Sequence, residues 1–504
     1  MLEERRGNCM VDTDSNSPEK RGKSRISRRR LVKAIGATGV TAGLAGCSSG
    51  GDGDGGSDGD GGSDGGTSGT SAGEIGGEVK IFAGSGWEED FDKQALYDAG
   101  LPDSVDVTFT TGPQATGSKQ QKLKIALDSE ARDPDLVMTD NGWTIPFIVR
   151  GDLVNLEEEM SADFISQVKE EGIQSMVQTG QHPETGDLYS VPVFPDFPTI
   201  QYRKDLFKKA GYGDSDFENW KTNPPTWAKF SELVSEAHAE ADDVDYGHLW
   251  QGDNYVGLSC CTFNEFLTSM GGYFFGSHDN LFGPIGDRPV TIGEEKAIDG
   301  IELAQDLIHG EGESPMDVQA ISPTEVAGWI EPDTKSQFDT ELNAVAQRNW
   351  TYAIGGAADG FEGTDAELGV MPLPKGPNGS WHAQGGWIMS MNPYSDNIPA
   401  AKEVLRAWFN EGVYQEQLDS MNFLPGKADV FSYVEQHDNY GPYFEPLQYS
   451  GENMIPRPTT QVWPNQRTVV STEVNAALRK EKSAKAAAST MAEKIEAIEQ
   501  QAGG

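Results

Sequence analysis

The sequence predicts an α/β fold made of two lobes. Its 504 residues exceed the length that one hydrophobic core ordinarily serves. Runs rich in β-branched residues alternate along the chain with runs of helical spacing, which is typical of sheets covered by helices. Hydrophobic residues make up 36% of the chain, with 11 Trp, 14 Tyr and 21 Phe, so the composition supports a sizeable core and excludes global disorder.

The expected elements follow in a regular order from residue 78 onward. Strands are expected at 78–83, 105–109 and 135–138, and they are separated by helices at 88–99 and 119–128. The third strand leads into the turn Thr139-Asp140-Asn141-Gly142. Strands separated by helices imply parallel sheets covered on both faces. Clear later helices are expected at 226–241, 294–309, 398–410 and 483–500.

The amino terminus has the pattern of an export signal. Residues 1–33 are polar and basic, a mild apolar run follows to Gly46, and small residues precede Cys47. The paired Arg28 and Arg29 resemble a twin-arginine signal, which exports folded proteins. The run Leu44-Ala45-Gly46-Cys47 resembles a lipobox, in which Cys47 becomes the lipid-bearing first residue of the mature chain. The alternative is a basic tail with an ordinary buried cysteine.

A Gly-, Ser- and Asp-rich segment follows at 48–73 and contains nothing that can bury surface. We interpret 1–47 as a twin-arginine signal with a lipobox and 48–73 as a flexible, acidic tether. No run reaches the roughly 18 apolar residues of a membrane-spanning helix. A lipid followed by a tether predicts a domain that works close to the outer face of the cell membrane.

The charge is strongly acidic, with 39 Lys and Arg against 80 Asp and Glu and a net charge of −41. Residues 1–46 carry ten basic and five acidic side chains, so the remainder has a net charge of −46. This balance argues against nucleic acid as a partner, because phosphate binding needs clustered Lys and Arg. The acidic excess indicates a protein built for high salt, because salt screens the repulsion between its carboxylates. It also indicates a haloarchaeal source. An acidic extracellular protein without salt adaptation is the alternative.

Several segments carry a family resemblance. Residues 188–192 (LYSVP) and 202–207 (YRKDLF) form one pair, and 372–374 (PLP) with 385–387 (GGW) form another. Together with NFLPG at 422–426 and the closing amphipathic helix, they resemble the extracellular solute-binding proteins of ABC importers, across about residues 78–500. The two pairs are similar to that family's lobe crossover and return strand.

Three further segments are similar to the trehalose/maltose-type binders of this family. They are LWQGDNY at 249–255, QRNWTY at 347–352 and IPRP at 455–458. Two features depart from that pattern. Val256 stands where such binders often carry an acidic residue after the tyrosine, and 277–289 is rich in insertions.

The resemblance implies a two-lobed periplasmic-binding-protein-like (type II) fold with a ligand cleft between the lobes. Lobe 1 is expected to comprise 74–195 and 390–432, and lobe 2 to comprise 196–389 and 433–504. Contacts from both lobes would couple ligand binding to closure, and the permease's transmembrane subunits would recognise the closed form. The expected protein is a monomeric receptor for a di- or monosaccharide of the trehalose, maltose or glucose type. It is not an enzyme, and it needs no cofactor or metal.

The residues also favour a sugar by their chemistry. Carboxylates, amides and Arg suit the hydroxyls at the edge of a sugar ring, and an aromatic plate suits its apolar face. The candidates fall in turns after predicted strands, where ligands of open α/β sheets gather. We assign ligand binding to Asp140, Asp196, Tyr202, Trp250, Trp350, Tyr352, Gly386, Trp387 and Arg457, with Trp87 and Glu89 as additional first-lobe contacts.

Some of these residues have defined expected roles. Asp140 would accept hydrogen bonds from two hydroxyls, and Gly386 would let the backbone approach the ligand while Trp387 lies across the cleft. Arg457, held between two prolines, would donate a fork of hydrogen bonds. For each residue an ordinary structural role is the alternative, such as a turn cap, a hinge hydrogen bond, core packing or an ion pair.

Other chemistries find little support. Cys260 and Cys261 are adjacent, and because a disulfide between neighbours is strained we expect buried thiols. Zinc spacing, a calcium loop, a P-loop, a nucleophile elbow and a dinucleotide fingerprint are all missing from the sequence. Two alternatives stay open. One is a glycan-active enzyme with Asp140 and Asp196 as its acid pair. The other is a receptor for glycerol phosphate or another anionic solute, which would need clustered positive charge where only Arg457 is obvious.

Overall fold

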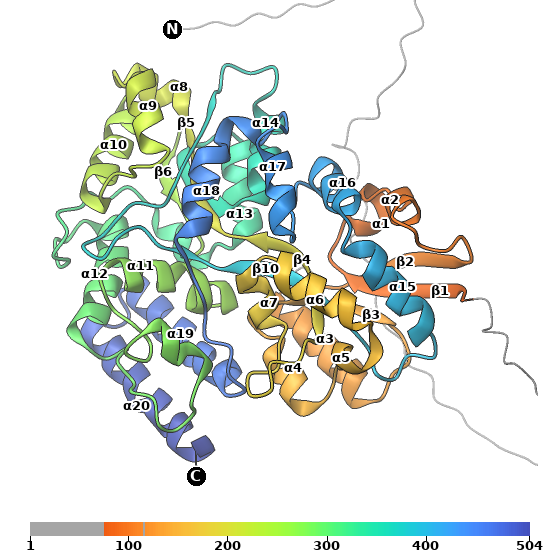
Figure 1. The fold of residues 1–504 in the computed structure, drawn as a ribbon. Helices are drawn as coiled ribbons and strands as arrows, with labels where there is room; N and C mark the ends of the chain where they lie inside the picture. Colours follow the sequence, from red (N-terminus) through yellow and green to blue (C-terminus); the bar gives the residue numbers. More distant parts are fainter. Residues whose placement is uncertain (1–74, 114–115, 504) are drawn as a thin grey trace, which may run out of the picture. The chain divides into compact units, whose positions relative to one another are not determined.

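The computed structural model describes residues 75–113 and 116–503, which belong to one compact unit. Arg28, Arg29, Cys47 and the tether expected at 48–73 lie outside the described residues. The described chain contains two large sheets, each covered by its own helices, and the chain passes between them more than once (Figure 1). No helix in this part of the chain is long and apolar enough to cross a membrane.

The first lobe is built around a five-stranded sheet in the order β2-β1-β3-β10-β4. Strands β1, β2 and β3 are parallel, whereas β10 runs antiparallel to both β3 and β4. The strands are β1 Gly77–Ala83, β2 Val105–Thr111, β3 Leu136–Asp140, β4 Ser190–Asp196 and β10 Gly385–Met391. The helices are α1 Trp87–Asp90, α2 Gln94–Asp98, α3 Thr116–Asp128, α4 Ile145–Arg150, α5 Leu156–Glu159, α6 Ala162–Glu171, α7 Gln174–Thr179, α15 Ile398–Trp408 and α16 Glu411–Met421.

Alternation along these strands decides which side chains meet which helices. Ile81 and Phe82 are neighbours on β1, yet Ile81 joins the core under α15 and α16, while Phe82 joins the core under α3 and α4. Leu136 and Val137 divide in the same way on β3. Because successive strand residues point to opposite faces, apolar runs of this kind produce a sheet that is buried on both sides.

The second lobe has a four-stranded sheet in the order β6-β7-β5-β8 and a small two-stranded sheet of β9 and β11. The strands are β5 Pro198–Arg203, β6 Tyr246–Leu249, β7 Ala344–Trp350, β8 Leu368–Met371, β9 His382–Ala383 and β11 Met454–Ile455. The α-helices are α8 Lys204–Lys209, α9 Asp214–Trp220, α10 Trp227–Ala239, α11 Phe263–Ser269, α12 Glu295–His309, α13 Glu331–Lys335, α14 Tyr352–Phe361, α17 Phe431–Val434, α18 Phe444–Glu452, α19 Trp463–Leu478 and α20 Ala484–Gly503. Short 3₁₀ or π turns are η2 Leu258–Thr262, η3 His278–Phe282, η4 Thr324–Gly328, η5 Ser336–Thr340 and η7 Gly441–Tyr443, whereas the turn η6 Ala428–Val430 packs through Val430 in the core of the first lobe.

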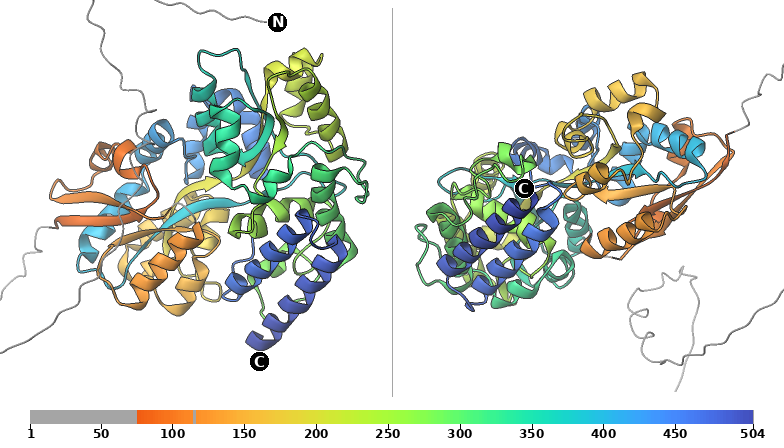
Figure 2. Two further views of the ribbon diagram at one scale, coloured as in Figure 1. Left: turned by 180° about the vertical axis from the view of Figure 1, so that it is seen from behind. Right: turned by 90° about the horizontal axis from the view of Figure 1, so that it is seen from below.

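Local signals explain several of these helices. The Thr226 hydroxyl accepts a hydrogen bond from the Lys229 amide at 3.2 Å and so caps the start of α10. Gly310 ends α12 in the left-handed conformation with φ of 66°. The two long C-terminal helices, α19 and α20, pack against one another at one end of the second lobe (Figures 1 and 2).

The strands that cross between the lobes position the functional site. Strand β4 ends at Asp196 in the first sheet, and β5 begins two residues later in the second sheet. The chain returns from β9 through Gln384 into β10, so the boundary expected after residue 389 falls inside a strand of the first sheet. Gly385 pairs with Asp196, which places both crossings side by side.

The sheets are mixed rather than parallel as expected. The β10 strand runs against β3 and β4, and β5 runs against both β7 and β8. In each case an antiparallel member is a strand that passes between the lobes, a direction that alternation of strands and helices does not reveal. The strand expected at 135–138 extends to Asp140, and the helix expected at 88–99 is divided into α1 and α2.

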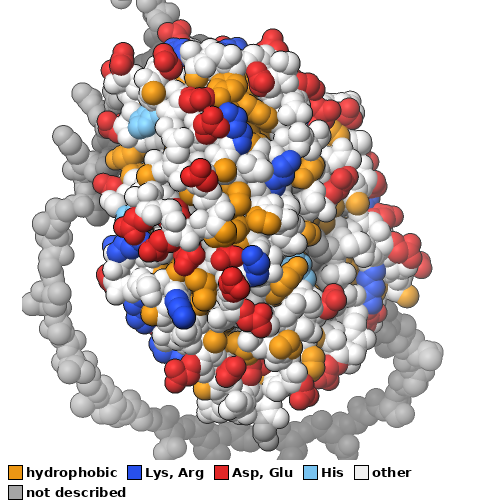
Figure 3. All heavy atoms as spheres, turned by 90° about the vertical axis from the view of Figure 1, so that its left-hand side faces the viewer, with side chains coloured by type: hydrophobic (Ala, Val, Ile, Leu, Met, Phe, Trp, Pro, Cys, Tyr) orange, Lys and Arg blue, Asp and Glu red, His pale blue; other side chains and the backbone are white. Residues whose placement is uncertain are grey.

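Carboxylates are spread widely over the face of the molecule drawn in Figure 3, and they outnumber the basic side chains there. This distribution follows from the excess of 80 acidic over 39 basic residues in the chain. Like charges at this density repel one another unless salt screens them.

Candidate functional site

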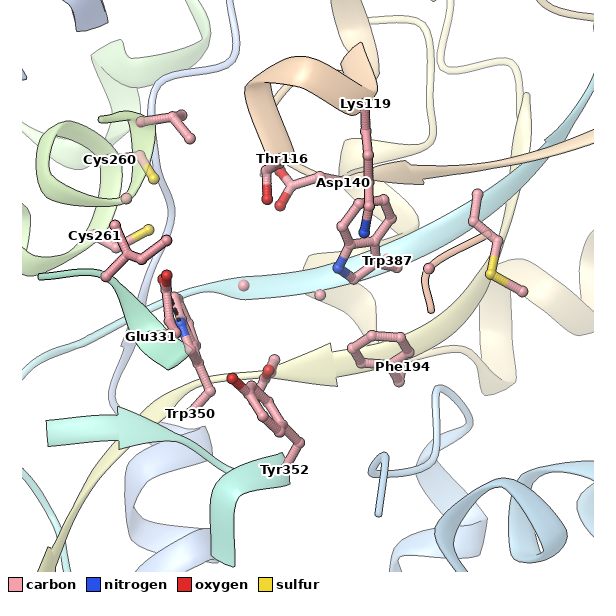
Figure 4. A pocket seen from close by; sticks show the side chains of 18 of the residues that line it. Thr116, Lys119, Asp140, Phe194, Cys260, Cys261, Glu331, Trp350, Tyr352 and Trp387 are labelled. Carbon is pink, nitrogen blue, oxygen red and sulfur yellow. Dashed lines mark hydrogen bonds between the residues drawn. The ribbon is translucent and has the colours of Figure 1, made fainter. Parts of the chain in front are cut away.

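A cavity of about 460 Å³ is lined by residues of both lobes. This volume lies in the usual range of ligand pockets, roughly 300–1,000 Å³. Its first-lobe wall includes Lys119, Asp140 and Trp387, and its second-lobe wall includes Glu331 and Trp350 (Figure 4). The cavity therefore lies where the crossing strands join the two sheets.

Asp140 occupies the end of β3 and is the central carboxylate of the first-lobe wall. Its Oδ1 accepts hydrogen bonds from the Gly142 amide at 2.8 Å and from Arg457 Nη2 at 2.7 Å. Within the described chain its Oδ2 accepts none, so this oxygen is available to a ligand. Asp140 and Trp387 are direct partners on neighbouring strands, and their side chains project from the same face.

Arg457 crosses from the second lobe to the first. It follows β11, is 6% exposed, and forms with Asp140 an ion pair between residues 317 positions apart. Its Nη2 also donates to the Asn141 side-chain oxygen, and its Nη1 lies 3.3 Å from the Cys260 sulfur. Burial alone would lower the pKa of Arg457, but the Asp140 carboxylate together with Cys260 and Cys261 outweighs it and raises the pKa above the ordinary value.

Two tryptophans stand on opposite walls of the cavity. Trp387 packs edge-on against Trp143 with ring centroids 6.2 Å apart. Trp350 donates from Nε1 to Glu331 Oε1 at 3.1 Å, and the Arg348 guanidinium lies 4.6 Å from its ring centre. These contacts fix both rings, so each offers a rigid apolar plate to a ligand.

Glu331, at the first turn of α13, is a carboxylate that the sequence patterns did not single out. Its Oε1 accepts hydrogen bonds from Tyr255 Oη at 2.8 Å and from Trp350 Nε1 at 3.1 Å. Both donors are neutral, and the charge has no cationic partner within ion-pair distance among the described residues. Val256, which replaces the acidic residue common in similar binders, lines the same wall. Glu331 therefore provides a carboxylate at this wall.

Asp196 lies at the crossing between the sheets. Its Oδ1 accepts hydrogen bonds from the Thr351 amide at 2.9 Å and the Thr351 hydroxyl at 2.5 Å. Burial raises the pKa of Asp196 to about 7, although the Thr351 hydrogen bonds act in the opposite direction. The carboxyl group therefore links the crossing strand to Thr351 and lines the cavity at the same time.

Lys119 is a cationic residue of the cavity that was also missed from the sequence. It is 8% exposed, and its Nζ lies 4.6 Å from the centre of the Trp387 ring. Within the part of the chain that the structure describes, Lys119 has neither a carboxylate within ion-pair distance nor a side-chain hydrogen bond. Its spacing with Leu123 and Leu127, which share its buried helix face, is the signal that identifies it.

The structure brings most of the assigned residues together. Asp140, Asp196, Trp350, Tyr352, Gly386, Trp387, Arg457 and Trp87 all line the cavity. Trp87 does so from within an aromatic cluster, stacked 5.7 Å from Phe109 and 5.6 Å from Phe423. The Gly386 backbone also permits close packing of strands, because a side chain there would meet the Phe194 carbonyl oxygen at 2.4 Å.

Three assigned residues lie away from the cavity. The Tyr202 side chain projects from the face of β5 that packs on the core of the second lobe, where its ring centroid lies 5.1 Å from that of Phe207. Trp250 is 1% exposed and donates to the Ser322 hydroxyl at 3.0 Å. Glu89 is exposed on the surface of α1. These three residue types suit a sugar. However, the face of the strand, helix or loop from which each side chain projects directs it away from the cavity.

Cys260 and Cys261 are both buried and both thiols are free, as expected. They lie on the π turn η2 and line the second-lobe side of the cavity. The Arg457 Nη1 atom lies 3.3 Å from one sulfur and 3.7 Å from the other. Their position at this wall was not anticipated from the sequence.

Comparisons with known proteins agree with this architecture. The model of the bacterial extracellular solute-binding protein family matches residues 83–415. The chain belongs to this family. A probable ABC transporter-binding protein of Deinococcus radiodurans is 26% identical over 354 residues, covering 69% of this chain and 75% of the relative.

Solved structures show the same fold. Maltose-bound MalE3 of T. maritima superposes with a TM-score of 0.67 at 24% identity, covering 83% of this chain and 98% of that one. The GacH receptor of Streptomyces glaucescens, solved with acarbose, gives 0.66 at 20% identity, covering 84% and 99%. UgpB of Mycobacterium tuberculosis, solved with glycerophosphocholine, gives 0.65 at 17% identity, covering 85% and 100%. The solute-binding protein thus has the expected two-lobed periplasmic-binding-protein-like fold.

Family membership also confirms the broader functional expectation. The family consists of extracellular binding proteins of ABC importers, so a solute, a permease and a location outside the cytoplasm are implied. The family and the structural neighbours are binding proteins rather than enzymes.

Proposed function

We propose that this solute-binding protein captures a sugar in the cavity between its lobes and delivers it to the permease of an ABC importer. The observation that carries the proposal is the composition of the cavity. Aromatic plates stand on both walls, and acidic oxygens lie at both ends, at Asp140 and at Glu331. Apolar plates with a few polar groups match the alternating faces and edges of a sugar ring.

The position of the cavity supports capture by closure. A ligand in contact with Trp387 and Trp350 at once would touch both lobes, so it would favour the closed arrangement over an open one. The permease would then recognise the closed form. Trehalose, maltose and glucose are the sugars that the sequence segments favour.

Two contacts favour binding over glycan hydrolysis. A glycosidase needs an acid and a base or nucleophile, both directed at one bond. Asp140 is instead paired with Arg457, and Asp196 is hydrogen-bonded to Thr351 at the hinge. Both carboxyl groups therefore have partners that suit a structural and binding role.

Calorimetric titration of the purified chain against trehalose, maltose, glucose and other monosaccharides tests the sugar proposal. Glu331→Gln should weaken the binding of the preferred sugar by roughly tenfold to 150-fold, since hydrogen bonds to charged groups contribute roughly 1.5–3 kcal/mol. Glu341→Gln is the matched control, because Glu341 is exposed and lies outside the cavity. Binding of neither these sugars nor their acidic derivatives, or equal loss in both variants, would contradict the proposal.

We also propose that the protein is exported by the twin-arginine pathway and anchored by a lipid on Cys47. Arg28→Lys combined with Arg29→Lys should leave the protein inside the cell. Cys47→Ser should release it into the medium instead of the membrane fraction. Unchanged fractionation of either variant would remove the corresponding part of the proposal.

A third part of the proposal is adaptation to high salt. The acidic surface predicts loss of helical signal when KCl falls from about 3 M to about 0.1 M, because the Debye length grows from a few ångströms to roughly 10 Å. Circular dichroism measures this directly. A constant spectrum across that range would show that the charge is not a salt adaptation.

A further inference from the structure

One end of the cavity concentrates positive charge. Lys119 and Arg457 line the cavity with Asp140, and among the described residues the charge of Asp140 acts on both of them and on Arg467, which lies outside the cavity lining. Arg467, on α19, reaches the first lobe through a hydrogen bond from Nη2 to Gln120 Oε1 of 2.6 Å. Lys119 and Arg457 against Asp140 leave an excess of positive charge at this end of the cavity, in a chain whose net charge is −41.

Lys119 carries the charge that Asp140 does not neutralise. The Asp140 Oδ1 atom is already paired with Arg457, at 2.7 Å. Lys119 is 8% exposed and lines the cavity, with its ammonium over the Trp387 ring at 4.6 Å. A buried ammonium without a carboxylate partner is unfavourable, because it gives up hydration for a weaker cation–π contact. An anionic group of a ligand would supply the missing partner.

The start of α3 strengthens the same end of the cavity. The helix begins at Thr116, which lines the cavity beside Asp140 and Lys119 (Figure 4). The N-terminus of a helix carries a partial positive charge and favours anions. The 13-residue α3 thus adds its dipole to the charge of Lys119.

We propose that the ligand is a sugar or polyol that carries a carboxylate or phosphate group, held between Lys119, Arg457 and the first turn of α3. This inference rests on the proposed function and names the class of ligand. The rest of the ligand lies between Trp387 and Trp350, and Glu331 at the opposite wall accepts its hydroxyl hydrogens. A neutral sugar would leave the Lys119 ammonium with hydroxyl oxygens as its only new partners.

Titration with matched pairs of neutral and acidic ligands tests this. Glucose is compared with glucuronate and with glucose 1-phosphate, maltose with maltobionate, and glycerol with glycerol 3-phosphate, using the purified full-length chain at one pH and salt concentration. We expect at least one acidic member to bind ten times or more tighter than its neutral parent. The carboxylate and phosphate arms distinguish the two sources of negative charge.

The Lys119→Gln variant assigns the effect to one residue. It should reduce the preference for the acid to less than threefold. Lys122→Gln is the matched control, since it removes the same charge from the same helix at an exposed position over Phe82. The control should keep the wild-type preference.

Each other outcome overturns the inference. Neutral sugars that bind at least as tightly as their acids would refute it and leave the proposed sugar-receptor function intact. An acid preference that survives Lys119→Gln unchanged would place the anionic group elsewhere. If neither member of any pair binds, the proposed function fails, and the inference fails with it. The wild-type ratio decides the ligand class without any variant.

Discussion

The ion pair between Asp140 and Arg457 gives a quantitative test of the contact between the lobes. The two side chains are 11% and 6% exposed, and Nη2 lies 2.7 Å from Oδ1. Unit charges about 4 Å apart attract by about 4 kcal/mol at an effective dielectric of about 20. Removing one partner of such a pair leaves the other buried and unpaired, which ordinarily lowers the unfolding free energy by roughly 3–5 kcal/mol.

A double-mutant cycle isolates this interaction. Asp140→Asn keeps an acceptor for the Gly142 amide, and Arg457→Met keeps the apolar stem, so each variant removes mainly the charge. We expect each single variant to lose about 3 kcal/mol and the coupling energy to be about 2–3 kcal/mol. Urea denaturation in molar KCl, followed by circular dichroism, measures the loss. Urea is preferred to guanidinium because it adds no salt to an acidic protein.

The buried pair of Arg348 and Glu265 is the control, because both residues lie within the second lobe. Its coupling should not change when ligand is added, since the pair does not depend on closure. The coupling of Asp140 with Arg457 should rise on ligand addition if closure forms the contact. A coupling energy below about 0.5 kcal/mol between Asp140 and Arg457 would refute the contact between the lobes in solution.

Three further predictions concern single residues. Trp387→Ala should weaken ligand binding by about 2–4 kcal/mol in calorimetry, because the rigid plate is lost, and unchanged affinity would move the site elsewhere. Gly386→Ala should lower the unfolding free energy by roughly 2–4 kcal/mol, since φ is 121° and the new carbon would meet the Phe194 oxygen at 2.4 Å. Gly117→Ala, which meets nothing within 4 Å, is the control, and equal losses would contradict the packing. For Asp196, with its pKa raised to about 7, the native state holds a proton that the unfolded chain releases near pH 4. Its contribution to stability is therefore lost as pH rises from about 4 to 7, and Asp196→Asn should flatten that decline in urea denaturation curves, whereas a parallel decline in the variant would disprove the shift.

Much of the fold follows from local patterns in the sequence. The strand at 105–111, the helix at 295–309 and the helix at 398–408 begin within one residue of where the spacing and the preceding residues predict. Apolar side chains at two-residue or helical intervals must be buried on one face of their strand or helix, whichever elements pack against it. The pattern therefore predicts the element without knowledge of its neighbours. The direction of β10 had no such signal, because pairing partners far apart in sequence determine it.

The sequence predicted those residues of the candidate site that stand at the ends of strands. Asp140 and Trp387 were assigned because each stands at a turn or beside paired glycines, and the register of β3 with β10 brings them together. Tyr202 and Trp250 suited the ligand equally well by type. Their side chains point into the second-lobe core, and only the tertiary packing determines that face.

The sequence by itself determined the composition of the chain, the order of its helices and strands, the acidic charge and the segments that mark its family. The tertiary structure decided which polar groups remain available to a ligand. Arg457 meets Asp140 across 317 positions, and Glu331 meets Tyr255 and Trp350 from separate elements. Lys119 shares a buried helix face with Leu123 and Leu127, yet only the folded chain brings its ammonium beside a tryptophan and, among residues 75–113 and 116–503, leaves it without a carboxylate partner. Electrostatic pairing depends on distances of a few ångströms, and those distances are fixed only when the two sheets come together.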